Sequence, residues 1–126
     1  MNRDMPLILV VDDDVQARKW TLTFLEVEGY EVLEAKDGNE ALALSTLHQP
    51  DLVVIDVYMP GKEGLKTIQL MRKQHLTVKI LAISGHFYEG YDVGTVAKAF
   101  GASAILPKPF STKELLDQIE TLLKTD

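Results

Sequence analysis

The chain has 126 residues, the size of one domain, and its 13 basic and 19 acidic side chains leave a formal net charge of −6. An acidic chain lacks the basic surface that binds phosphate backbones, so we expect no direct nucleic-acid partner. The sequence has no cysteine, which excludes disulfide scaffolds and cysteine-based metal or thiol chemistry, and no apolar run approaches the ~18 residues of a membrane span.

The first half of the chain alternates short apolar runs with helical patterns. The run Leu7–Val11 is continuously apolar, as expected of a strand that is covered on both faces. It is too short for the apolar region of a signal peptide, so we expect a cytoplasmic protein without a membrane partner. The predicted elements are, in order, a strand over Leu7–Val11, a helix that ends near Gly29, a strand over Tyr30–Ala35, a helix capped by Asp37 and a strand over Leu52–Ile55.

The second half repeats this alternation. Its predicted elements are a turn at Pro60-Gly61, a helix marked by Leu65, Ile68 and Met71, a strand over Val78–Ile83, a weaker helix over Val93–Phe100, a strand over Ala104–Leu106 and a last helix. Ser111 and Glu114 have the spacing of a capping box at the start of that helix. The aromatic residues Trp20, Phe24 and Phe100 are expected in the core.

Five strand–helix units in succession imply a parallel sheet with helices on both faces, so the expected fold class is α/β and doubly wound. Right-handed crossovers and the number of strands favour the flavodoxin-like strand order 2-1-3-4-5. We expect one domain over residues 1–126. Ligands of such sheets bind at the carboxyl ends of the strands, here in the crevice between the first and third strands.

Polar residues stand where four of the predicted strands end. They are Asp12 and Asp13 after the first strand, Asp56 after the third, Ser84 after the fourth and Lys108 after the fifth. The carboxylates outnumber the ammonium group and repel one another in a partly desolvated crevice, and a divalent cation would neutralise them. All the candidate ligands are oxygen atoms, so we expect Mg²⁺. Such a site suits phosphoryl transfer, in which an aspartate can accept the phosphoryl group.

Four motifs at these strand ends resemble a known family. They are VVDDD at residues 10–14, VVIDVYMPGKEG at 53–64, AISG at 82–85 and GASAILPKPF at 101–110. Each motif alone is weak, but their order and spacing together resemble the receiver domain of response regulators in bacterial two-component signalling. The resemblance implies the flavodoxin-like receiver fold.

The resemblance also implies a metal site and a phosphorylation site. Asp56 matches the aspartate that is phosphorylated and that also contacts the metal. Asp12 and Asp13 match the acid pair that holds Mg²⁺, Asp13 directly and Asp12 through water. The main-chain carbonyl of Tyr58 matches a further metal ligand.

Two more residues receive roles from the resemblance. Ser84 matches the hydroxyl that binds a phosphoryl oxygen, and Lys108 matches the lysine that pairs with the phosphoryl group. The bond from Lys108 to Pro109 is cis in that family. Asp14 lies outside the matched acid pair and is expected to face solvent or to cap the first helix.

The partners follow from the same resemblance. A sensor histidine kinase or a histidine phosphotransfer protein donates the phosphoryl group, and the receiver catalyses its own phosphorylation and dephosphorylation without being a conventional enzyme. The fourth helix, fifth strand and fifth helix then present a surface to a downstream protein. The family commonly has Tyr or Phe at the position of Ile105, and an aliphatic switch residue cannot make the same ring-and-hydroxyl movement.

Several alternatives stay open. A Mg²⁺-dependent phosphohydrolase of small molecules typically has a second acid where this chain has Tyr58, and an FMN-binding module has a Ser/Thr/Gly-rich loop where it has DDDV. A degenerate receiver would act as a phosphorylation-independent interaction module. The last apolar stripe ends at Leu123, so we expect either a free-standing receiver, which the start at Met1 favours, or one cut from a longer regulator.

Overall fold

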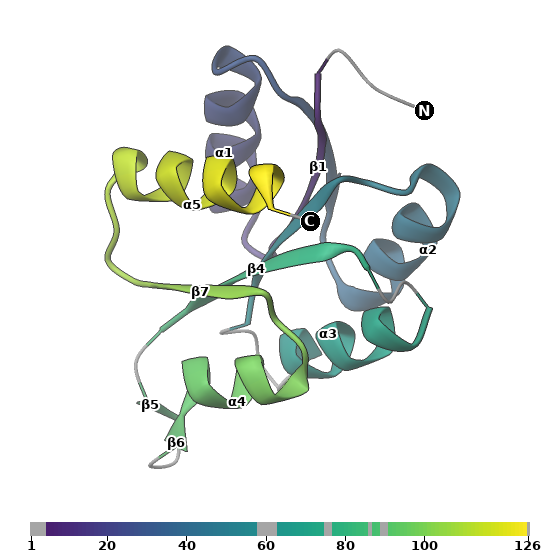
Figure 1. Ribbon diagram of the computed structural model, residues 1–126, viewed down its shortest axis with the longest axis vertical. Helices are drawn as coiled ribbons and strands as arrows, with labels where there is room; N and C mark the ends of the chain where they lie inside the picture. Colours follow the sequence, from purple (N-terminus) through teal and green to yellow (C-terminus); the bar gives the residue numbers. More distant parts are fainter. Residues whose placement is uncertain (1–4, 58–62, 75–76, 86, 89–90, 126) are drawn as a thin grey trace.

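The computed structural model describes residues 5–57, 63–74, 77–85, 87–88 and 91–125, and its centre is a parallel sheet (Figure 1). The strands of this sheet are β1 (Leu7–Val11), β2 (Glu31–Ala35), β3 (Leu52–Asp56), β4 (Lys79–Ser84) and β7 (Ala104–Pro107). Their order is β2-β1-β3-β4-β7, and every neighbouring pair is parallel. The predicted fold class and strand order are therefore confirmed, with β7 as the fifth strand.

Helices cover both faces of the sheet. They are α1 (Val15–Val27), α2 (Gly38–His48), α3 (Glu63–Gln74), α4 (Val93–Phe100) and α5 (Thr112–Lys124). α1 and α5 lie on one face, and α2, α3 and α4 lie on the other (Figure 1). Among the described helices, none is both long enough and apolar enough to cross a membrane.

Side-chain caps set where three of these helices begin. The Asp14 carboxylate accepts the Gln16 N–H at 2.9 Å, and the Asp37 carboxylate accepts the Glu40 N–H at 2.9 Å. The capping box predicted for the last helix is present, with Ser111 and Glu114 bonded reciprocally at 3.1 and 3.0 Å. Each cap satisfies backbone donors that the first turn of a helix leaves unpaired.

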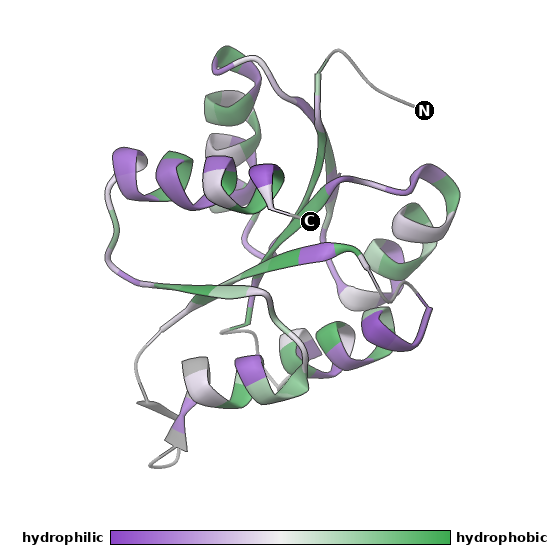
Figure 2. Cartoon of the chain, in the orientation of Figure 1, coloured by the Kyte–Doolittle hydropathy of each residue, from purple (hydrophilic) through white to green (hydrophobic). Residues whose placement is uncertain are grey.

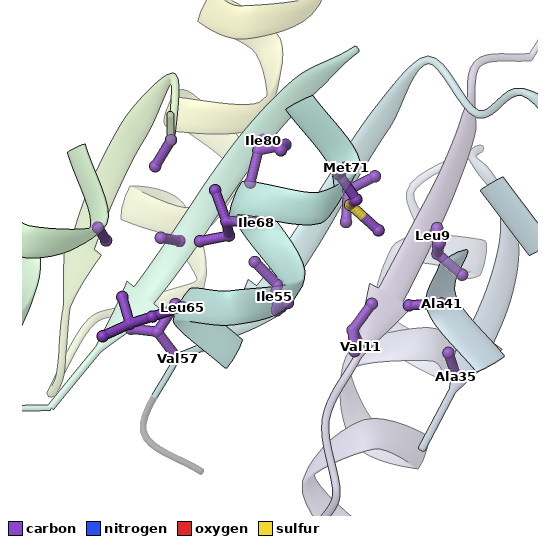
Figure 3. Packing of buried hydrophobic residues seen from close by; sticks show 14 residues of the cluster. Leu9, Val11, Ala35, Ala41, Ile55, Val57, Leu65, Ile68, Met71 and Ile80 are labelled. Atoms are coloured by element: carbon purple, nitrogen blue, oxygen red, sulfur yellow. The ribbon is translucent and has the colours of Figure 1, made fainter. Parts of the chain in front are cut away.

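The pleat of the buried strands divides the core into two layers. Successive side chains of a strand point to opposite faces. Accordingly Ile8 and Val10 of β1 belong to the layer that includes α1 and α5, and Leu9 and Val11 belong to the layer that includes α2, α3 and α4. Leu9 and Val11 lie beside Ala41 of α2 (Figure 3). The strands are coloured as hydrophobic over most of their length, whereas hydrophobic and hydrophilic residues alternate along the helices (Figure 2). The two-sided burial of β1, β3 and β4 explains why apolar runs predicted these strands to within about one residue.

A short antiparallel hairpin between β4 and α4 was not predicted. It consists of β5 (Phe87–Tyr88) and β6 (Tyr91–Asp92), in which Tyr88 pairs with Tyr91. Strands of two residues are too short to produce a periodic pattern. The sequence does carry one signal, since Tyr88 and Tyr91 are separated by two residues of which the second is Gly90, a spacing typical of tight hairpins. The fifth strand of the central sheet is therefore labelled β7.

The expectation that Trp20 lies in the core is wrong. Trp20 is 52% exposed, and its ring stacks on that of Phe24 at 5.4 Å between centroids. Phe24 and Phe100 are half-buried and pack against the two core layers, as predicted. Trp20 stays exposed because it lies on the side of α1 that borders an open cleft.

Candidate functional site

The alternation of the strands gathers the charged residues on one side of the sheet. Asp56 is two residues beyond Val54, which packs against α1 and α5, so its side chain leaves β3 on that same face. Asp12 follows Val10 by two residues, and Lys108 follows Leu106 by two. Asp12, Asp56 and Lys108 all line one cleft between α1 and α5, as the predicted convergence at the carboxyl ends of the strands requires.

Asp56 and Lys108 form an ion pair at the centre of this site. The Lys108 Nζ donates to the Asp56 Oδ2 at 2.8 Å. The Asp56 side chain is only 9% exposed, and the Lys108 side chain is 44% exposed. A buried carboxylate needs such a partner, because an isolated charge is costly to take out of water. The arrangement holds one carboxylate oxygen against a cation that can still contact solvent.

Backbone bonds fix this ion pair to the sheet. The Lys108 N–H donates to the Ser84 carbonyl at 2.8 Å, and the Val57 N–H donates to the Ile83 carbonyl at 3.0 Å. The residues that follow β3 and β7 are thereby bonded to β4 beyond the last residues of those two strands. Lys108 is joined to Pro109 by a cis peptide bond, as the family resemblance implied.

Asp12 lies in a partly desolvated and strongly charged position. Burial raises the pKa of the Asp12 carboxyl, and the negative charges of Asp56 and Asp13 add to this effect. The Asp14 N–H, which donates to Asp12 Oδ1 at 2.9 Å, and the Lys108 ammonium act in the opposite direction. The burial and the two like charges outweigh these stabilising contacts. A cation bound beside Asp12 would relieve this repulsion.

The oxygen atoms of the site fit a magnesium ion. In the parts of the chain that the structure describes, no group of three or more carboxylate, imidazole or thiolate side chains is assembled as a metal cluster. Mg²⁺ does not need such a cluster, since it usually takes one or two carboxylates and completes its shell with water and substrate oxygens. Asp12 and Asp56 face one cleft, and the exposed Asp13 adds its charge at the same place. This donor set, which is all oxygen and in excess negative charge, suits the ion.

The other predicted site residues lie at different depths. Ser84 is the last residue of β4 and is 3% exposed. Ile105 of β7 is half-buried and packs against the layer under α2, α3 and α4. Ala82 of β4 is its partner in the sheet. Tyr58, whose carbonyl was predicted as a metal ligand, lies outside the described residues, as does the predicted Pro60-Gly61 turn.

Sequence reasoning missed the apolar wall of the site. The cleft has a volume of about 300 Å³, and Trp20 and Thr21 of α1 and Phe110 and Leu115 at α5 line it beside the charged residues. Helical spacing assigned Trp20 to the core, because periodicity shows which face of a helix turns inward but not where that face ends. The cleft thus has an apolar wall on one side and the Asp56–Lys108 ion pair beside it.

Comparison with known proteins finds the same pattern over nearly the whole chain. Residues 8–120 match the family model described as the response regulator receiver domain. The chain is 39% identical over 122 residues to a probable transcriptional regulator of Cyanophora paradoxa, covering 93% of this chain and 48% of that protein. It is 37% identical over 121 residues to the transcriptional regulatory protein CpxR of Klebsiella pneumoniae, covering 95% and 50%. The chain thus spans about half the length of the curated relatives it matches.

Solved structures agree on the fold. The receiver domain of NtrX from Brucella abortus superposes with a TM-score of 0.85 at 34% identity, over 94% of this chain and 99% of that one. The chemotaxis protein CheY4 of Vibrio cholerae, crystallised at low pH, superposes with a TM-score of 0.83 at 32% identity, over 94% and 98%. Both matched chains are covered almost completely.

Proposed function

This chain belongs to the response regulator receiver family, and we propose that Asp56 is the residue at which it accepts a phosphoryl group. The observation that carries the proposal is the buried Asp56 carboxylate, which is held at 2.8 Å from the Lys108 ammonium and opens on a cleft beside Asp12. The Lys108 ammonium holds this carboxylate in the cleft, where an incoming phosphorus atom can approach it. The role is signalling by a phosphorylated protein and not turnover of a small substrate.

The proposed reaction is transfer from a phosphohistidine. An Asp56 carboxylate oxygen attacks the phosphorus, the phosphorus–nitrogen bond of the donor breaks, and the imidazole leaves with the bonding electron pair. Lys108 then balances the charge gained by the phosphoryl oxygens, and the Ser84 hydroxyl donates to one of them. Positioning and charge neutralisation of this kind provide most of the catalysis in phosphoryl transfer. Water later hydrolyses the acyl phosphate and returns Asp56 to a carboxylate.

Receiver domains bind Mg²⁺ at their acidic phosphorylation site, and in this chain the proposed ligands are Asp12, Asp13, Asp56 and the main-chain carbonyl of Tyr58. The ion supplies neutralisation of the negative charge that gathers between the attacking carboxylate and the phosphoryl oxygens. The raised pKa of Asp12 and the charges of its neighbours support this assignment.

The proposed partners are a histidine kinase or phosphotransfer protein upstream and a protein target downstream. The cleft supports the upstream partner, because Trp20 and Phe110 form an apolar surface beside Asp56 against which the donor's side chain can pack. For output we propose the surface of α4, β7 and α5, with Ser84 and Ile105 as the residues that change. Because Ile105 has no hydroxyl, the proposed change is a shift in apolar packing. The composition, which is free of cysteine, supports a reducing cytoplasm as the place of action.

Incubation with acetyl phosphate and Mg²⁺, followed by intact-mass measurement, tests the function. We expect one phosphoryl adduct on the wild-type chain and none when Mg²⁺ is removed or in Asp56→Asn. Asp14→Asn is the matched control, because asparagine also caps a helix, and it should be phosphorylated normally. An unmodified wild-type mass with several small donors would instead favour the degenerate receiver. Repeated turnover of a small phosphate ester that depends on Asp56 would favour the phosphohydrolase.

A further inference from the structure

Arg18 and Glu34 form a partly buried contact beside the site, and the proposed reaction does not use it. The Arg18 Nε donates to the Glu34 Oε1 at 2.8 Å, and the Arg18 Nη1 donates to the main-chain carbonyl of Asp12 at 2.9 Å. The Arg18 side chain is 12% exposed, although it lies in the first turns of a surface helix. One guanidinium therefore joins a strand carboxylate to the backbone of a proposed metal ligand.

The position of Glu34 explains how this guanidinium is held. Glu34 of β2 pairs in register with Val10 of β1, so its side chain points to the face that α1 covers. Its second oxygen, Oε2, accepts from Lys19 Nζ at 2.6 Å. The hydrogen bonds from Lys19 and Arg18, of which that from Lys19 has the larger effect, lower the pKa of the Glu34 carboxyl and keep it charged. Glu34 thus anchors Arg18 from the neighbouring strand.

The bond to Asp12 acts on both residues of the acid pair. The Asp12 carbonyl belongs to the peptide unit that joins Asp12 to Asp13, and a peptide unit is planar and rotates as one body. The Asp12 N–H donates to the Ala35 carbonyl at 3.1 Å, which fixes the preceding peptide unit to β2. Arg18 and Ala35 together hold the backbone on both sides of Asp12. The directions in which the Asp12 and Asp13 side chains leave the loop are set by these bonds.

We propose that Arg18, anchored by Glu34, is a positioning residue that orients the Asp12–Asp13 peptide unit so that both carboxylates face Mg²⁺. This inference rests on the proposed function of the acid pair as metal ligands. Groups that orient the ligands of a metal typically change its affinity about 10–100-fold when they are removed. Arginine is suited to the role because its rigid fork presents several donors at fixed angles, which lysine does not.

Electrostatics alone makes the opposite prediction. Arg18 is a cation near an acidic site, so its removal should strengthen Mg²⁺ binding if the charge is all that matters. Its neighbour Lys19 has the same charge and also contacts Glu34, but its side chain is 56% exposed and contacts no backbone atom of the acid pair in the described part of the chain. Lys19→Met is therefore a control with the same change of charge as Arg18→Met.

The experiment measures the dissociation constant of Mg²⁺ by calorimetry on the unphosphorylated full chain. Arg18→Met and Arg18→Lys should each weaken binding by about tenfold or more, and Lys19→Met should leave it unchanged or make it tighter. Glu34→Gln keeps an oxygen that can accept from Arg18, so its affinity should lie nearer to wild type than that of Arg18→Met. Far-UV circular dichroism checks that each variant is folded, and Arg18→Lys serves if Arg18→Met does not fold.

Two results would overturn the inference, and they are distinguishable from failure of the proposed function. Arg18 variants that bind Mg²⁺ as tightly as Lys19→Met would show that only charge matters. Equal weakening of Mg²⁺ binding in Arg18→Met, Arg18→Lys and Lys19→Met would show a general loss of helix stability. Absence of Mg²⁺ binding in the wild type would instead overturn the metal site itself, and this inference with it.

Discussion

Lys108 contacts Asp56 from a separate strand end, with its side chain 44% exposed and its ammonium at 2.8 Å from the buried carboxylate. This geometry suits a residue that responds to the charge on Asp56 as well as balancing it. Phosphorylation adds a charge of about −1.5 to −2, and Lys108 is the described cation that contacts Asp56. Lys108 follows the last residue of β7, and its N–H is bonded to the Ser84 carbonyl of β4, so a movement of the Lys108 backbone reaches both strands.

We therefore predict that Lys108→Ala still accepts a phosphoryl group from acetyl phosphate but loses the structural response. The measurement is hydrogen exchange of α4 and β7 amides in the phosphorylated and unphosphorylated chains. Wild type should show a difference between the two states and Lys108→Ala none. Lys113→Ala, which removes an exposed lysine of α5 bonded to Asp117, should behave as wild type. A full response in Lys108→Ala would remove the lysine from the switch.

The raised pKa of Asp12 makes metal binding depend on pH. Burial and the charges of Asp56 and Asp13 favour the protonated carboxyl, so it gains its proton at a higher pH than the ordinary value of 3.8. Mg²⁺ binds the ionised form, so its affinity should fall on acidification, starting above that ordinary value. Folding stability of the metal-free protein should change with pH in the opposite direction to Mg²⁺ affinity. Protonation of Asp12 relieves repulsion, so the ionised carboxylate lowers folding stability most at high pH.

The measurement is the Mg²⁺ dissociation constant across the acidic range, with Asp12→Asn as the control that removes this titration. Affinity that stays constant until the pH falls below the ordinary aspartate value would contradict the prediction. An identical pH profile in Asp12→Asn would assign the titration to another group.

At the scale of elements, α2 and α3 are in close contact where Gly38 meets Thr67. The Gly38 N–H donates to Glu63 Oε1 at 2.9 Å, and a Cβ atom added to Gly38 would overlap the Thr67 hydroxyl oxygen. Thr67 is 2% exposed and donates to the Glu63 carbonyl at 2.8 Å. The glycine thus lets α2 begin directly against α3, the helix that follows the Asp56 strand.

Gly38→Ala should lower the free energy of unfolding by about 1–3 kcal/mol through overpacking, although alanine is the better helix former by about 1 kcal/mol. Urea denaturation of a double-mutant cycle with Thr67→Ala gives the coupling. Removing the hydroxyl should recover much of the loss, with a coupling of about 0.5–3 kcal/mol. If Gly38→Ala raised the free energy of unfolding, or if the effects of Gly38→Ala and Thr67→Ala were additive, the predicted overpacking between these two residues would be contradicted.

The elements could be predicted from the sequence wherever burial is continuous. β1 and β3 are covered on both faces, and their apolar runs located them directly. Trp20 was misassigned because an apolar residue at helical spacing can border a cleft as well as fill a core. β5 and β6 were missed because two residues on each side carry no periodicity.

At the scale of the whole molecule, the fold brings together residues that are far apart in the sequence. Asp12, Asp56 and Lys108 lie at the ends of β1, β3 and β7, and the parallel order of the sheet places these ends at one edge. This convergence could be predicted from the alternation of strands and helices and from the polar residues that follow them. The Arg18–Glu34 contact could not, because it depends on which polar side chains of α1 and β2 meet.

The measurement that tests the account most directly is chemical trapping of the phosphorylated residue. Borohydride reduces an aspartyl phosphate to homoserine, and peptide mapping by mass spectrometry then locates the modified position. After incubation with acetyl phosphate and Mg²⁺, the account predicts homoserine at position 56 and at no other aspartate. Homoserine at Asp12, Asp13 or Asp14, or a phosphoryl adduct that borohydride does not convert, would contradict it.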